Sequence, residues 1–155
     1  MKYSVLGLNY TKSWEGCVLH AYLDTKNYWT IGWGYKGPDV REGLTWTQQQ
    51  ADEKLIEMYF AAWQNAQLWL QNTFPLLNEP RQCVVADMEY NMGFNTVKGF
   101  RNCYTAIIAQ EFDQAAWQMK WNRIGVPSQY SKDVPRRCNM NATMMLSGLM
   151  EKGNV

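Results

Sequence analysis

The feature that most constrains this fold is a change of sequence pattern near residue 46. Residues 18–35 are rich in strand-forming side chains, and Asp24-Thr25-Lys26-Asn27 interrupts them with residues typical of a turn. From residue 47 onward, apolar residues recur at helical spacing. The sequence therefore predicts an α+β fold, with a small N-terminal β-hairpin lobe, a larger and mostly helical lobe, and a cleft between them.

Helices are expected on both sides of the hairpin. A short helix is predicted over residues 4–14, with Gly16 as its terminator. Thr47 and Gln50 have the spacing of a capping box, which predicts a helix over residues 47–69 that connects the two lobes. The remaining helices are expected over residues 78–92, 96–110, 112–123 and 135–150.

The whole chain, residues 1–155, is expected to form one domain. Apolar residues make up 46% of it, which is enough for a real core. Residues 15–46 would form the β-rich lobe, residues 47–69 the connecting helix, and residues 70–155 the helical lobe together with the N-terminal helix. The sequence contains no internal repeat and no low-complexity tract.

The charge is unevenly distributed, although the net charge is only +1. Residues 1–97 carry seven Lys and Arg against ten Asp and Glu, whereas residues 98–155 carry eight against four. A basic half can attract nucleic acid, acidic lipid or the carboxylates of peptidoglycan, and it can equally be an ordinary solvated face. The surplus comes mainly from Lys98, Arg101, Lys120, Arg123, Lys132, Arg136 and Arg137.

The cysteines and the single histidine exclude several kinds of site. Cys17, Cys83, Cys103 and Cys138 are too far apart for a C-x-x-C motif, and His20 alone excludes a multi-histidine metal site. The N-terminus does not read as a secretion signal, and no apolar run approaches the roughly 18 residues that span a membrane. We therefore expect cytoplasmic synthesis, free thiols, and neither metal nor cofactor.

Three residues near the expected junction of the lobes suit glycoside hydrolysis. Glu15 follows the first helix, Asp24 lies in the hairpin turn, and Thr30 lies on the returning strand. The reaction needs an acid for the leaving oxygen and a carboxylate that activates water. A Glu packed against Trp14 would keep its proton while a solvated Asp stays charged, and Thr30 would orient the water. On spacing alone, ordinary surface carboxylates remain the more common explanation.

The local sequence adds a specific resemblance. Residues 14–24 read WEGCVLHAYLD and residues 28–34 read YWTIGWG. They resemble the phage-type lysozymes, glycoside hydrolase family 24, which include the lysozyme of the T-even coliphages. In that family E-G-x-x-L-x-x-Y-x-D is followed, after five residues, by T-I-G-x-G. Residues 36–46 and 124–134 align poorly. Similarity to later parts of the family pattern extends over residues 91–102, 112–116 and 135–137.

The resemblance implies a role for each matching residue. Glu15 would be the general acid, and Asp24 and Thr30 would hold the water that attacks the opposite face of the sugar, which gives inversion. The family has serine at the position of Cys103 and asparagine at that of Gln118, and a thiol donates a poor hydrogen bond. Cys103 is equally interpretable as a small buried core residue. The substrate contacts that the resemblance implies are Lys36, Tyr90, Cys103 and Gln118.

Two further positions depart from the family pattern. Tyr35 stands where the family usually has a histidine with a mainly structural ion pair. Trp14 stands where the family often has an acidic residue, which would pair with an arginine near the C-terminus. Trp14 would either make the pocket of Glu15 drier or belong to the core.

The activity implied is that of a muramidase, which cuts the β-1,4 bond between N-acetylmuramic acid and N-acetylglucosamine in bacterial peptidoglycan. The expected setting is a monomeric phage endolysin, held in the host cytoplasm until its release to the cell wall, with no nucleic-acid partner and no stable membrane insertion. An injected bacterial effector and a phage-tail domain would use the same chemistry. A catalytically inactive glycan-binding module and a basic membrane-active protein are alternatives from other classes. The presence together of Glu15, Asp24 and Thr30 argues against the inactive module, and the weak net charge argues against the membrane-active protein.

Overall fold

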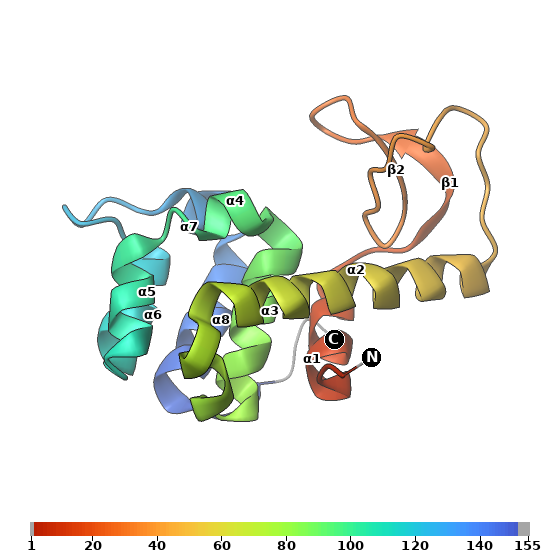
Figure 1. Cartoon of the computed structure of the whole chain (residues 1–155). Helices are drawn as coiled ribbons and strands as arrows, with labels where there is room; N and C mark the ends of the chain where they lie inside the picture. The colour runs from red at the N-terminus through yellow and green to blue at the C-terminus, as the bar shows by residue number, and fades with distance from the viewer. Residues whose placement is uncertain (1, 152–155) are drawn as a thin grey trace.

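The computed structural model describes residues 2–151 and confirms the α+β fold, with a small hairpin lobe beside a larger helical body (Figure 1). Helix α1 (Val5–Lys12) precedes strands β1 (Val18–Leu23) and β2 (Trp29–Gly32), and helix α2 (Gln48–Leu70) follows them. The rest of the described chain forms η1 (Gln71–Leu76), α3 (Glu79–Met92), α4 (Phe94–Val97), α5 (Arg101–Ile108), α6 (Phe112–Lys120), α7 (Gln129–Asp133) and α8 (Pro135–Ser147).

The hairpin lobe is held together mainly by backbone hydrogen bonds. Strands β1 and β2 pair antiparallel, and residues 44–46 lie along β1 as an isolated bridge. Hydrogen bonds of 2.8 Å join Ala21 to Leu44 and Trp46 to Leu19. The ring of Trp46 also closes the hairpin from one side, because a Cβ at residue 32 would lie 2.9 Å from it.

Helix α2 runs from the hairpin lobe into the helical body and contacts both β2 and α3 (Figure 1). Its capping box is formed as the sequence predicts, because the Thr47 side chain accepts from the backbone N–H of Gln50 and the Gln50 side chain accepts from that of Thr47. Beyond the first turns, Leu55, Tyr59 and Trp63 follow one another at helical spacing on its buried face. The same helix therefore belongs to both lobes.

Helix α3 is the centre of the helical body. It contacts α1, α2, α4 and α8, and residues 83–89 of this helix are all buried. Asn78 caps its N-terminus by accepting from the backbone N–H of Arg81, and Pro80 lies in its first turn. No helix within residues 2–151 combines the length and the apolar character that crossing a membrane requires.

Several expected boundaries are wrong. The helix expected over residues 96–110 is two helices, because the chain makes tight turns at residues 98–100 between α4 and α5. A side chain at Gly99 would be crowded there, since its Cβ would lie 3.0 Å from the carbonyl oxygen of Thr96. Helix α1 ends at Lys12, and its C-cap Ser13 precedes Gly16 by three residues.

The segment before the last helix also differs from expectation. The sequence predicts no helix between residues 123 and 135, but Ser128 accepts from the backbone N–H of Ser131 and caps a short helix, α7. Helix α6 ends at Lys120 rather than at residue 123, because Trp121 adopts an extended backbone and pairs with Pro127. These short caps and turns are hard to predict, because they change the hydrophobic pattern of the sequence very little.

Candidate active site

A cavity of about 550 Å³ lies between the hairpin lobe and the helical body. Five of the seven residues singled out from the sequence line it together, and they come from both sides. The other two, Cys103 and Gln118, line a separate hollow of about 460 Å³ in the helical body. The residues that line the first cavity are Glu15, Tyr22, Asp24, Thr30, Trp33, Gly34, Tyr35, Lys36, Met58, Tyr90 and Asn91.

Glu15 lies between α1 and β1, and its side chain is 20% exposed. Its Oε1 accepts a hydrogen bond of 2.6 Å from Nη1 of Arg137. Its Oε2 lies on the side of Gly34, where a Cβ would stand 3.6 Å away. Gly34 has φ +90°, which a residue with a side chain rarely adopts. Glycine therefore keeps both the backbone geometry and the space next to this carboxyl group.

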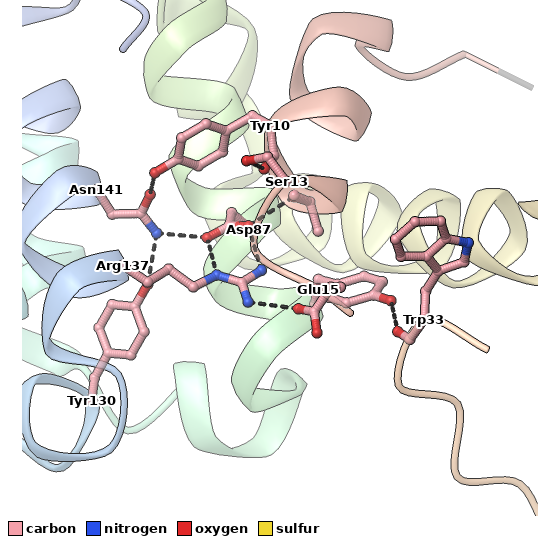
Figure 2. Close-up of polar contacts among 10 residues, drawn as sticks. Tyr10, Ser13, Glu15, Trp33, Asp87, Tyr130, Arg137 and Asn141 are labelled. Atoms are coloured by element: carbon pink, nitrogen blue, oxygen red, sulfur yellow. Dashed lines mark hydrogen bonds and ion pairs between the residues drawn. The ribbon is translucent and has the colours of Figure 1, made fainter. Parts of the chain in front are cut away.

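A buried ion pair fixes the arginine that holds Glu15 (Figure 2). Nε and Nη2 of Arg137 donate to Oδ2 and Oδ1 of Asp87, at 2.9 and 2.7 Å. Asp87 also accepts from Thr11 and Asn141, each at 2.7 Å. Burial by itself lowers the pKa of Arg137, but the charges of Asp87 and Glu15 raise it by more than burial lowers it. The guanidinium therefore stays charged. The carboxylate of Asp87 thus joins α1, α3 and α8 behind the cavity wall.

Two buried tyrosines complete this network. Tyr10 donates to Oδ1 of Asn141, and Nδ2 of Asn141 donates to the hydroxyl of Tyr130, both at 2.6 Å (Figure 2). Burial, and then the charge of Asp87, raise the pKa of both phenols, which therefore remain neutral. This network was not predicted from the sequence, although Asp87, directly after the apolar residues 83–86, was a signal for it.

Asp24 is the first residue after β1, and it organises the hairpin turn. Its Oδ1 accepts from the backbone N–H groups of Lys26 and Tyr28, at 2.8 and 2.9 Å. Its Oδ2 accepts from Nζ of Lys36 at 2.5 Å. The hydrogen bond from Lys36, followed by that from the backbone of Tyr28, lowers the pKa of Asp24 to about 2. Asp24 is therefore a charged and oriented carboxylate.

Thr30 lies on β2 at the edge of the same cavity, and only 1% of its surface is exposed. Its Oγ1 donates to the carbonyl oxygen of Tyr28 at 3.0 Å. Because this bond uses the one proton of the hydroxyl, the oxygen can act only as an acceptor toward any molecule in the cavity.

Side chains of the helical body also tie the two walls together. The hydroxyl of Tyr90, on α3, donates to the carbonyl oxygen of Trp33 at 2.7 Å. The indole of Trp33 in turn donates to Asp52 at 2.8 Å, and Asp52 pairs with Lys12 at 3.0 Å. Residues from α1, α2 and α3 thereby fix the position of the chain that follows β2.

The two departures from the family pattern have structural explanations. The ring of Tyr35 stacks on Trp46 with centroids 5.6 Å apart, and its hydroxyl donates to Asp39 at 2.9 Å. Stacking and a hydrogen bond thus hold the position where the family's histidine would form an ion pair. Trp14 packs edge-on against Tyr10, with centroids 6.1 Å apart, and is a partly buried side chain that packs against the helical core.

The structure also places the remaining sequence candidates. Arg137 is buried and paired, so it does not add to the exposed basic surface expected from residues 98–155. His20 is exposed and does not line the cavity. Cys103 is 1% exposed, and its thiol points to the carbonyl oxygen of Ala115 at 3.6 Å, as expected for a small core residue. The cysteines are all free, and Cys17 is the one that is not buried.

Comparison with known proteins identifies the family. The family model described as phage lysozyme matches residues 12–138, which run from the last residue of α1 to the start of α8 and include both walls of the cavity. The chain therefore belongs to the phage lysozyme family.

Curated relatives carry the name endolysin. The chain is 51% identical to the endolysin of Lactococcus phage c2 over 57 residues, which are 36% of this chain and 24% of the relative. It is 29% identical to the endolysin of Bacillus phage B103 over 155 residues, covering 96% and 55% of the two chains. It is 30% identical to that of Bacillus phage PZA over 138 residues, covering 81% and 48%. The chain thus spans about half the length, or less, of these relatives.

Proposed function

We propose that this chain is the lysozyme domain of a phage endolysin, and that it acts as a muramidase of the glycoside hydrolase family 24 type. It would hydrolyse the β-1,4 bond between N-acetylmuramic acid and N-acetylglucosamine in bacterial peptidoglycan. The observation that carries this proposal is the meeting of Glu15, Asp24 and Thr30, in the spacing of the family pattern, around one cavity between the lobes.

Glu15 is the proposed general acid. Because Arg137 holds Oε1, the proton would be carried by Oε2, on the side of Gly34. Transfer of this proton to the glycosidic oxygen lets the bond between that oxygen and the anomeric carbon break, and the bonding electrons leave with the oxygen. The developing positive charge on the sugar is then opposed by the charged Asp24.

Asp24 and Thr30 are proposed to hold the attacking water. Since Oγ1 of Thr30 can only accept, a bound water would donate one proton to it and the other toward Asp24. A lone pair of the water then faces the anomeric carbon, and attack from the side opposite the leaving group inverts the configuration. The proton released by the water goes to Asp24 and on to solvent.

The substrate is proposed to extend from the cavity along the helical body. Lys36 and Tyr90 border the cavity, while Cys103 and Gln118 border the second hollow. Among the described residues that line this hollow none is acidic, and three are basic: Arg101, Arg123 and Lys132. Such a surface suits a polymer that bears carboxylates, as peptidoglycan does.

The proposed setting is lysis of a phage-infected bacterium, with the protein in the host cytoplasm until it reaches the cell wall. The names of the relatives support an endolysin rather than an injected effector with the same chemistry. Both walls of the cavity come from one chain, so a monomer suffices. The proposed reaction uses neither a cofactor nor a nucleic-acid or membrane partner.

The test combines product analysis with one substitution. Mass spectrometry of fragments released from purified peptidoglycan should find muramic acid at the reducing ends. Glu15→Gln should lower the rate by about 10²–10⁴, because it removes the proton donor while keeping the shape. Glu42→Gln, at an exposed loop position, is the matched control and should keep full activity. Reducing-end glucosamine, or normal activity of folded Glu15→Gln, would contradict the proposal.

A further inference from the structure

Asp24 has little freedom to rotate. Its Oδ1 closes the hairpin turn through the N–H groups of Lys26 and Tyr28. The backbone of Asp24 is paired as well, because its N–H donates to the carbonyl oxygen of Tyr28 at 3.0 Å and its carbonyl oxygen accepts from Asn27 at 2.9 Å. Only Oδ2 is left to face the cavity, and the contact at Oδ2 therefore decides how the carboxylate presents itself.

That contact comes from Lys36, which lies 12 residues further along the chain. The backbone next to Lys36 is anchored, since the N–H and carbonyl groups of Tyr35 exchange hydrogen bonds of 2.9 and 3.0 Å with those of Ile31. The stacking of Tyr35 on Trp46 holds the same segment from the other side. Lys36 thus reaches Asp24 from a fixed loop, although its own side chain is 47% exposed.

The other titratable groups around the cavity do not compete for this contact. Glu15, which precedes β1, is paired with Arg137. Burial raises the pKa of Tyr90, on α3, and the hydrogen bond to Asp39 raises that of Tyr35, so both remain neutral phenols. Besides Asp24 and Lys36, the remaining titratable side chain of the lining is the phenol Tyr22, on β1. Among the described residues that line the cavity, Lys36 is the only cation.

We propose that Lys36 is a positioning residue for the hydrolysis: its ammonium group holds Oδ2 of Asp24 and so fixes the direction from which this carboxylate meets water and sugar. This inference rests on the proposed function. It assigns Lys36 a task that differs from the substrate contact implied by the family resemblance, because Lys36 acts through Asp24.

The contact has two opposing consequences for catalysis. A carboxylate whose pKa is about 2 is a weak base, so the pairing reduces the ability of Asp24 to remove a proton. The same pairing keeps Asp24 charged in acid and holds it in one orientation. If positioning is the main contribution, loss of Lys36 lowers the rate even though Asp24 becomes more basic.

The experiment compares Lys36→Met with Lys36→Arg and with Lys26→Met. Lys26 is the matched control, because it gives Asp24 only its backbone N–H, which the substitution keeps. Carboxyl NMR of the full chain should show the pKa of Asp24 rising from about 2 toward the ordinary value of about 3.9 in Lys36→Met. Lys36→Arg and Lys26→Met should leave it near the wild-type value.

Kinetics on peptidoglycan give the second measurement. In Lys36→Met, kcat should fall by up to about 100-fold with little change in KM, and the acidic limb of the pH profile should move to higher pH. Lys36→Arg should recover most of the rate. An unchanged titration of Asp24, a higher kcat, or a rise in KM with kcat unchanged would overturn the inference. A wild-type chain that fails to hydrolyse peptidoglycan would instead overturn the proposed function, while the titration of Asp24 still reports whether Lys36 holds it.

Discussion

Asp24 and Glu15 face the same cavity, but the contacts that hold them differ in burial and in distance along the chain. Asp24 is held by its own turn and by Lys36, 12 residues away, in contacts that solvent reaches. Glu15 is held by Arg137, 122 residues away, and Arg137 is itself fixed by the fully buried Asp87. The carboxylate of the hairpin wall is therefore held by contacts that are local in the sequence, whereas that of the helical wall depends on residues from the whole tertiary fold.

The largest stability effect should follow from removing the buried ion pair between Arg137 and Asp87 in the helical wall. Arg137→Met leaves the charge of Asp87 buried without its ion-pair partner, which should lower the free energy of unfolding by about 3–5 kcal/mol. Chemical denaturation measures this effect. Lys36→Met breaks the exposed pair of the hairpin wall and should change stability little. Equal losses in the two variants would contradict the contrast between the walls.

A second buried carboxyl group on α3 tests whether it is pairing that makes burial tolerable. Glu89 is 3% exposed, and neither of its oxygens has a hydrogen-bond partner among the described residues. Burial raises its pKa from 4.5 to about 7. Between these values the folded chain binds more protons than the unfolded chain, so this group makes the free energy of unfolding fall as pH rises. The total decrease should be about 3 kcal/mol, complete above pH 7.

Glu89→Gln should remove this slope, because the amide does not titrate. Denaturation of wild type and variant between pH 4 and 8 provides the measurement. Glu53→Gln, at an exposed position on α2, is the matched control and should keep the slope. A slope that persists in Glu89→Gln would show that another group carries it.

The smallest effect should come from the contact that joins the two walls. Tyr90→Phe removes the hydroxyl that donates to the carbonyl oxygen of Trp33, and this should lower the free energy of unfolding by about 1 kcal/mol. Thermal or chemical denaturation will detect this change. Tyr104→Phe, on α5, removes a hydroxyl away from the junction and should have less effect. If Tyr90→Phe lowered the free energy of unfolding as much as Arg137→Met does, the contact between the two walls would be a major contributor to stability, contrary to this prediction.

The same contrast explains how much could be predicted from the sequence. The turn at Asp24 and the capping box of Thr47 depend on residues within a few positions, and each formed as expected. The meeting of Glu15, Asp24 and Thr30 at one cavity followed from the family pattern. These parts of the fold and site are encoded locally, so the order of residue types reveals them.

Other parts could not be predicted because distant residues decide them. Nothing near Glu15 in the sequence indicates that Arg137 holds it, nor that Asp87 holds Arg137. The break at Gly99 and the short helix α7 depend on tight turns with weak local signals. Lys36 was expected to contact substrate, and its hydrogen bond to Asp24 appeared only with the loop geometry.

The sequence separation of 122 residues between Glu15 and Arg137 also has a consequence for biosynthesis. Translation proceeds at about 5–20 residues per second, so roughly 6–24 s pass between the synthesis of these two residues. During that interval the nascent chain can form its hairpin turn, with Asp24 and Lys36 already in contact. Glu15 and Asp87 cannot form their ion pairs until Arg137 has been synthesised. One half of the cavity is thus available early on the ribosome, and the other is completed only when the last long helix has been made.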